Sequence, residues 1–135
     1  MIELSKEKPY EDACKILGLR PVANYKSYKL TDETRNFIKL ETVAKALNEG
    51  WKPTTIDPKE VRYYVWGWNY TDNRKPSGLL GVLSDGGLGD AYADVGTSLE
   101  FKDRDTAKEF ARMCKPMIVK YLFGRDDHEN FKFDF

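Results

Sequence analysis

The segment 61–70, VRYYVWGWNY, constrains the fold more than any other part of the chain. It places five aromatic rings within ten residues, and aromatic and β-branched residues favour strands. Side chains alternate between the two faces of a strand, and in this strand neither face is simply polar. The apolar groups on both faces are therefore expected to be buried, against the rest of the fold or against a partner. Gly67 marks a candidate bulge, which would move Trp68 to the other face.

Helical periodicity predicts three helices, within residues 8–21, 31–53 and 103–124. The first is expected to stop at Gly18 and the second at Gly50, because glycine readily adopts the left-handed conformation that ends a helix. Thr31 or Asp32 would cap the start of the second helix. Pro116 lies inside the third helix, where it removes a backbone donor, so a kink is predicted just before it.

Two more strands are predicted, at residues 78–85 and 97–103, and sequential strands with short connections pair antiparallel. The order of the elements indicates an α+β fold: a small antiparallel sheet of about three strands, with N-terminal helices and a long C-terminal helix packed on one face. The 135 residues fit one domain, predicted to span 1–123. Residues 124–135 form a predicted flexible tail, acidic and then aromatic. That tail could instead dock as an extended segment on a sheet edge or a partner.

The charge balance, the cysteines and the lack of long apolar runs exclude several classes of protein. Basic and acidic residues balance at 22 each, which argues against a dedicated duplex-binding domain, because such domains neutralise phosphates with basic side chains. Cys14 and Cys114 lie far apart in predicted helices and are interpreted as small buried packing residues rather than a disulfide. No run approaches the ~20 apolar residues of a membrane span, and the start of the chain has no apolar signal segment. We therefore expect a cytoplasmic protein without membrane contact.

Few residues are suited to catalysis. The one histidine, His128, lies in the predicted tail, and the cysteines lack the short spacing of a zinc site. The loop SDGGLGDAYAD carries Asp85, Asp90 and Asp94, but it lacks the Lys-Ser/Thr of a P-loop and the carboxylate spacing of an EF-hand. Turn formation is the favoured interpretation of this loop, with weak cation binding and catalysis as alternatives. We therefore predict a protein that is not an enzyme, with no catalytic residues, no cofactor and no metal.

The aromatic segment is the strongest candidate for a binding site. The predicted partner-binding residues are Arg62, Tyr64, Trp66, Trp68, Tyr70, Arg74 and Lys75. The leading hypothesis is a protein-binding or self-associating module that uses this surface. The alternative is a single-stranded nucleic-acid binder, because such proteins stack bases on exposed aromatic rings beside cations. A third interpretation is that the rings are closed within the core of the fold.

Four blocks of sequence occur together in the chain. They are YEDACKILG at 10–18, ALNEGWKP at 46–53, YYVWGW at 63–68 and ADVGTSLEFKDRDTAKEFA at 93–111. In this order they resemble a family of small proteins from gut Bacteroidales phages and prophages. Members of that family usually have a proline in the central strand and none in the terminal helix, whereas this chain has Val65 and Pro116 there. The resemblance implies a phage-derived protein that acts in the bacterial cytoplasm or in a particle, with a host or phage protein as partner.

Overall fold

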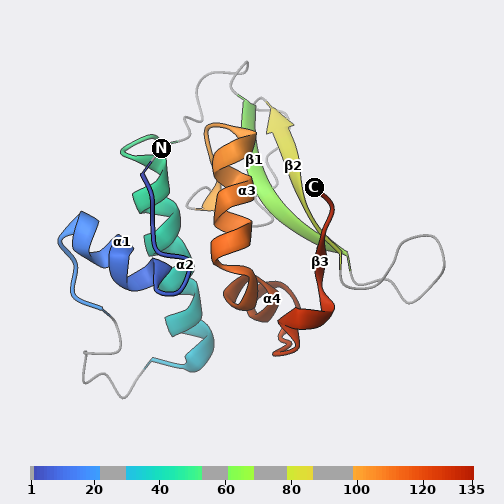
Figure 1. Ribbon diagram of the computed structural model, residues 1–135, viewed down its shortest axis with the longest axis horizontal. Coiled ribbons are helices and arrows are strands. Elements are labelled where there is room, and N and C mark those ends of the chain that lie inside the picture. Colours follow the sequence, from blue (N-terminus) through green and yellow to red (C-terminus); the bar gives the residue numbers. More distant parts are fainter. Residues whose placement is uncertain (1, 22–29, 53–60, 69–78, 87–98) are drawn as a thin grey trace.

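The computed structural model describes residues 2–21, 30–52, 61–68, 79–86 and 99–135, and these residues form an α+β fold (Figure 1). In chain order their elements are α1 (Pro9–Leu17), α2 (Asp32–Asn48), β1 (Val61–Trp68), β2 (Leu79–Gly86), α3 (Arg104–Met113), α4 (Lys115–Phe123), the short 3-10 helix η3 (His128–Asn130) and β3 (Lys132–Phe133). α3 and α4 lie between the sheet and α2, and α1 packs on the other side of α2 (Figure 1). The predicted α+β class is confirmed.

The helix boundaries follow local signals in the sequence. α1 ends at Gly18, which has a φ of 67°. The Thr31 side chain caps α2 by accepting a hydrogen bond from the backbone N–H of Thr34 at 3.1 Å. α2 ends with two consecutive left-handed residues, Glu49 with a φ of 49° and Gly50 with a φ of 90°. The helix therefore ends one residue earlier than a stop at Gly50 alone would give.

The predicted kink in the C-terminal helix is a complete break. α3 ends at Met113, Cys114 leaves the helical conformation, and α4 begins at Lys115 with Pro116 in its first turn. Proline has no backbone N–H, and its ring clashes with the carbonyl four residues earlier, so the hydrogen-bond ladder of α3 cannot continue through it. The structure therefore has two helices where the sequence predicts one long helix, and the break lies where the kink is predicted.

β1 and β2 pair antiparallel over the full length of both strands. The register is continuous through Gly67, which pairs with Leu80, so the bulge considered at this glycine is absent. A Cβ atom at Gly67 would lie 2.5 Å from Cζ of Phe123 in α4. Gly67 therefore serves the close approach of α4 to the sheet rather than a bend in the strand.

The third strand of the sheet comes from the C-terminal segment. β3 pairs parallel with β2 through two residue pairs, so the sheet is mixed and the prediction of an antiparallel sheet is corrected. Of the predicted strand 97–103, the described residues contribute a single antiparallel bridge between Phe101 and Tyr63 of β1. Asp103 caps α3 shortly after this bridge, and the start of the helix ends any extended pairing there.

Residues 124–135 dock on the sheet, which is the second of the two alternatives that the sequence leaves open for them. Phe131 is fully buried and stacks on Phe123 with ring centroids 5.1 Å apart. In the turn before it, Asp127 accepts hydrogen bonds from Nε of Arg125 at 2.8 Å and from Nδ2 of Asn130 at 2.9 Å. These bonds, the one from Arg125 first, lower the pKa of the Asp127 carboxyl group.

The core lies between the helices and one face of the sheet. Its largest fully buried side chains are Phe101, Phe131, Leu40, Leu80, Val43, Val119, Cys14 and Cys114. Both cysteines are free thiols, as their interpretation as packing residues requires. Burial raises the pKa of the Cys114 thiol to about 12. Among the described helices, none combines the length and the apolar character needed to cross a membrane.

Candidate functional site

β1 carries the predicted binding residues, and its pairing with β2 decides which of them share a face. Directly opposite residues of an antiparallel pair lie on the same side of the sheet. Val65 and Leu80 are 4% and 0% exposed, and Val65 lines a small void together with side chains of α2, α3 and α4. This side of the sheet therefore packs on the helices. The opposite side, which we call the outer face, carries Arg62, Tyr64 and Trp66 of β1 and Leu83 of β2.

Tyr64 and Trp66 form the aromatic centre of the outer face. Their ring centroids lie 6.4 Å apart with an interplanar angle of 82°, the edge-to-face arrangement that aromatic quadrupoles favour. Trp66 is paired across the ladder with Gly81. Both rings are half-buried, and Leu83, the partner of Tyr64 in the ladder, is 36% exposed. Tyr64 also packs against the hydrophobic core. The outer face therefore carries a partly covered aromatic pair and an exposed leucine.

Arg62 on the outer face is neutralised by Glu100. Its Nε lies 3.1 Å from Oε2 of Glu100, and the two side chains are 12% and 6% exposed. Asn48 at the end of α2 donates from Nδ2 to the backbone carbonyl of Glu100 at 3.0 Å, so α2 helps to position this residue. Removing one partner of a buried ion pair leaves an uncompensated charge, which is costly. Arg62 is therefore committed within the protein and is poorly suited to bind a phosphate.

The other predicted binding residues are described in part or not at all. Trp68 belongs to β1 by its backbone, whereas its side chain lies outside the described part of the chain, as do Tyr70, Arg74 and Lys75. Leu83 was missed in the sequence analysis. The alternation of the second predicted strand places Leu83 on one face, but only the register with β1 shows that this face is shared with Tyr64.

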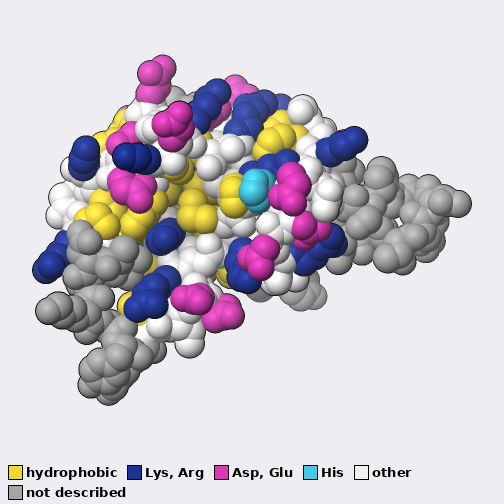
Figure 2. Space-filling model, turned by 60° about the horizontal axis from the view of Figure 1, so that its bottom comes forward, with side chains coloured by type: hydrophobic (Ala, Val, Ile, Leu, Met, Phe, Trp, Pro, Cys, Tyr) yellow, Lys and Arg dark blue, Asp and Glu magenta, His cyan; other side chains and the backbone are white. Residues whose placement is uncertain are grey.

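The surface charges are mixed. Figure 2 shows one side of the molecule, on which described basic and acidic side chains are interspersed. Some of them are paired, as in the contact of Lys120 with Asp126 at 3.1 Å and of Arg112 with Glu109 at 3.6 Å. On this side, the described residues form no continuous basic track of the kind that follows a nucleic-acid backbone.

The described residues offer little chemistry for catalysis. Asp103 caps α3 by accepting a hydrogen bond from the backbone N–H of Thr106 at 2.8 Å, and this bond lowers the pKa of the Asp103 carboxyl group. Within the described ranges, no three or more His, Cys, Asp and Glu side chains form a group able to hold a metal ion. Of the aspartates in the predicted acidic loop, Asp85 belongs to β2 by its backbone, whereas Asp90 and Asp94 lie outside the described residues.

A polar cleft of about 320 Å³ lies between the end of α2 and the start of α3. It is lined by Leu47, Asn48, Glu49, Lys102, Asp103, Asp105 and Thr106. Two of its polar groups already have structural partners, because Asn48 holds the backbone of residue 100 and Asp103 caps α3. This cleft could not be predicted from the sequence, since it joins segments that are far apart in the chain.

Comparisons of the chain with protein-family models, with curated proteins and with solved structures found no match. The resemblance to the phage and prophage family therefore stays a prediction. The fold and the site define an α+β domain in which helices cover one face of the sheet, while the outer face carries an aromatic pair beside a buried ion pair.

Proposed function

We propose that this chain is a self-associating, protein-binding module without enzymatic activity, and that two copies meet through the outer face. The observation that carries the proposal is the half-buried, edge-to-face pair of Tyr64 and Trp66 on the side of the sheet away from α3 and α4. Tyrosine and tryptophan are enriched among the residues that dominate interface energies, because they combine a large apolar area with a polar tip.

The balanced charge of the chain supports a second copy as the partner. A formal net charge of zero at pH 7 gives little long-range repulsion between copies. Arg62 forms its ion pair with Glu100 of the same chain. A contact made through the outer face therefore does not have to bury an uncompensated charge of Arg62. A two-fold dimer would place the outer face of one copy against the same face of the other. The resemblance to phage proteins adds phage and host proteins as further candidate partners.

Single-stranded nucleic acid is the weaker candidate for this face. Base stacking on aromatic rings contributes roughly 1 to 3 kcal/mol per base, but such sites also use cations that follow the backbone. Arg62, the basic residue of β1, is already paired with Glu100. A protein contact therefore fits the described side chains better than a phosphate backbone does.

Light scattering of the full chain at increasing concentration tests the proposal. We expect the mass of the wild type to rise from 15.6 kDa towards twice that value, and the double variant Trp66→Ser/Leu83→Ser to stay monomeric. Ile16→Ser is the matched control, because Ile16 is an apolar residue of α1 that is 47% exposed. A wild type that remains monomeric up to millimolar concentration would exclude self-association.

Titration with single-stranded oligo-dT separates the two candidates. Self-association through the outer face predicts no salt-dependent change of tryptophan fluorescence when the oligonucleotide is added. Quenching that recovers at high salt and disappears in the Trp66→Ser variant would instead support nucleic-acid binding, because phosphate contacts weaken as salt rises.

A further inference from the structure

The C-terminal segment is anchored firmly at its start and loosely at its end. Phe131, Phe133 and Phe135 occupy alternate positions, which an extended segment places on one side. Phe131 is fully buried, Phe133 is half-buried and Phe135 is 37% exposed. The rings of Phe133 and Phe135 stack with centroids 5.0 Å apart. The exposure of the rings therefore increases along the segment.

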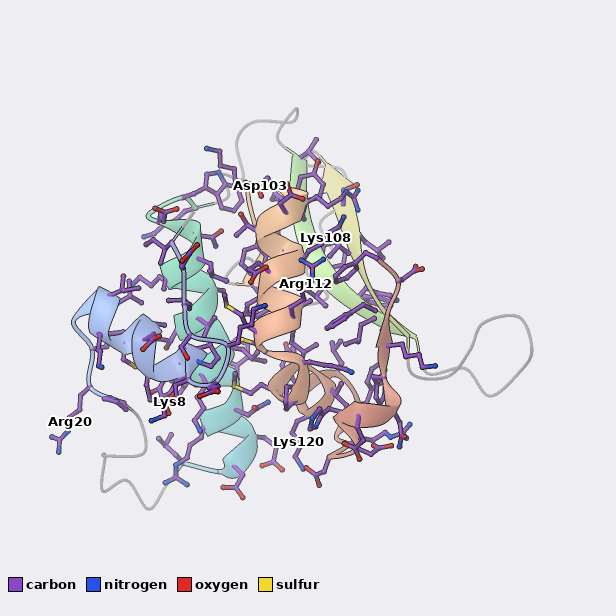
Figure 3. The ribbon with its side chains drawn as sticks, viewed as in Figure 1. Lys8, Arg20, Asp103, Lys108, Arg112 and Lys120 are labelled. Carbon is purple, nitrogen blue, oxygen red and sulfur yellow. The ribbon has the colours of Figure 1, made fainter. Side chains whose placement is uncertain are left out.

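A row of cations from α3 and the start of α4 lies over these rings. Nζ of Lys108 is 5.6 Å and Cζ of Arg112 is 5.1 Å from the centroid of the Phe135 ring. Nζ of Lys115 is 5.4 Å from the centroid of the Phe133 ring. Figure 3 shows Lys108 and Arg112 on the side of α3 that is turned towards the C-terminal strand. This side of α3 is a cationic wall that suits aromatic rings, and Arg112 within it is also paired with Glu109 at 3.6 Å.

The edge of β2 forms the other wall, and the C-terminal segment uses only part of it. The backbone N–H of Asp134 donates to the carbonyl of Leu80 at 2.6 Å. Further along β2, the carbonyl of Val82 accepts a hydrogen bond from Nη1 of Arg104 at 3.1 Å. Arg104 therefore occupies the edge of β2 beyond the bond made by Asp134. We call the space between α3 and this edge, which the C-terminal segment fills, the groove.

We propose that this groove between α3 and the edge of β2 is a peptide-binding site, and that residues 132–135 occupy it as a displaceable internal ligand. The peptide it fits is an extended strand with aromatic side chains at alternate positions, as in Phe133 and Phe135 of this chain. The site shares no residue with the outer face and does not depend on the proposed self-association.

The internal segment can leave the groove without unfolding the domain. β3 forms only two residue pairs with β2, and strand addition at a sheet edge relies on backbone hydrogen bonds that any peptide can supply. The buried ring of Phe131 and the turn held by Asp127 anchor the chain just before the segment. While it is bound, the internal segment competes at high effective concentration and weakens the apparent affinity for a peptide in solution.

Binding of a fluorescein-labelled peptide to the full chain tests this proposal. The peptide copies residues 130–135, NFKFDF. The double variant Phe133→Ser/Phe135→Ser empties the groove and is expected to bind this peptide about tenfold more tightly than the wild type, because the internal competitor is weakened. Equal affinity of the two proteins, or equal binding of a control peptide with serine at both phenylalanine positions, would overturn the proposal.

A charge reversal locates the binding site. Adding Lys108→Glu and Arg112→Glu to the emptied variant should abolish peptide binding, because both cations lie over the ring of Phe135. Lys45→Glu, a reversal on the exposed side of α2, is the matched control and should leave binding unchanged. If both reversals weaken binding equally, the peptide is held by general electrostatic attraction and not by this groove.

Hydrogen exchange of the unmodified chain provides a test that needs no variant. The amide of Asp134 should exchange faster than amides of the core strands, and excess peptide should remove its remaining protection. If this amide exchanges only through global unfolding of the domain, the segment is not displaceable and the proposal fails.

Discussion

Phe123 of α4 lies so close to Gly67 of β1 that a Cβ atom on the glycine would be 2.5 Å from Cζ of the ring. The same ring stacks on Phe131 of the C-terminal segment. One glycine therefore permits a contact that joins β1, α4 and the C-terminal segment. Because the third strand follows Phe131 directly, the docking of β3 depends on this contact.

The substitution Gly67→Ala tests the close approach. We expect it to lower the free energy of unfolding by about 1 to 3 kcal/mol, because the added methyl group forces apart groups that are already packed. The midpoint of urea unfolding measures this loss. Ser84→Ala on β2 is the control, since Ser84 is exposed and such changes usually stay within about 0.5 kcal/mol. Equal midpoints for Gly67→Ala and the wild type would contradict the contact.

Phe131 and Phe135 should differ greatly in their contribution to stability. Phe131→Ala removes a fully buried ring and is expected to cost about 3 to 5 kcal/mol. Phe135→Ala removes a ring that is 37% exposed and is expected to cost about 1 kcal/mol or less. The free energies of unfolding of the two variants, measured in urea, test this difference. Similar losses would mean that the segment is anchored along its whole length.

The ion pair of Arg62 with Glu100 should be costly to break and inexpensive to replace. Glu100→Gln leaves the guanidinium group of Arg62 almost buried without its counter-charge, and we expect a loss of about 3 to 5 kcal/mol. The double variant Arg62→Met/Glu100→Leu should recover most of this loss. A double-mutant cycle on unfolding free energies measures the coupling between the two residues. A coupling near zero would show that the pair is not formed.

Cys114 should make the stability of the domain depend on alkaline pH. The folded chain raises the pKa of this thiol to about 12, whereas an unfolded thiol ionises near ~8.5. The raised folded pKa means that the contribution is fully present below about pH 8.5 and is lost as the pH rises towards 12. At about pH 9.5 the expected loss is about 1 kcal/mol. The Cys114→Ala variant should lack this part of the slope in urea unfolding, and an identical slope in both proteins would contradict the assignment.

Part of the candidate site could be predicted from the sequence. The composition of residues 61–70 predicted a strand, and its alternation placed Arg62, Tyr64 and Trp66 on one face, as the structure shows. The partner of Arg62 could not be predicted, because Glu100 follows it by a long stretch of chain. Among the described residues, a single bridge at Phe101 brings Glu100 alongside β1. Leu83 joined the site for the same reason, since its face depends on the register of two strands.

The sequence by itself determined several of the helix boundaries. The cap at Thr31, the left-handed residue at Gly18 and the break before Pro116 all depend on hydrogen bonds and sterics within one helical turn. Only the tertiary structure decided that β3 completes the sheet and that Gly67 receives the ring of Phe123. Those choices depend on contacts between residues far apart in the chain, and such contacts form only when the whole core packs together.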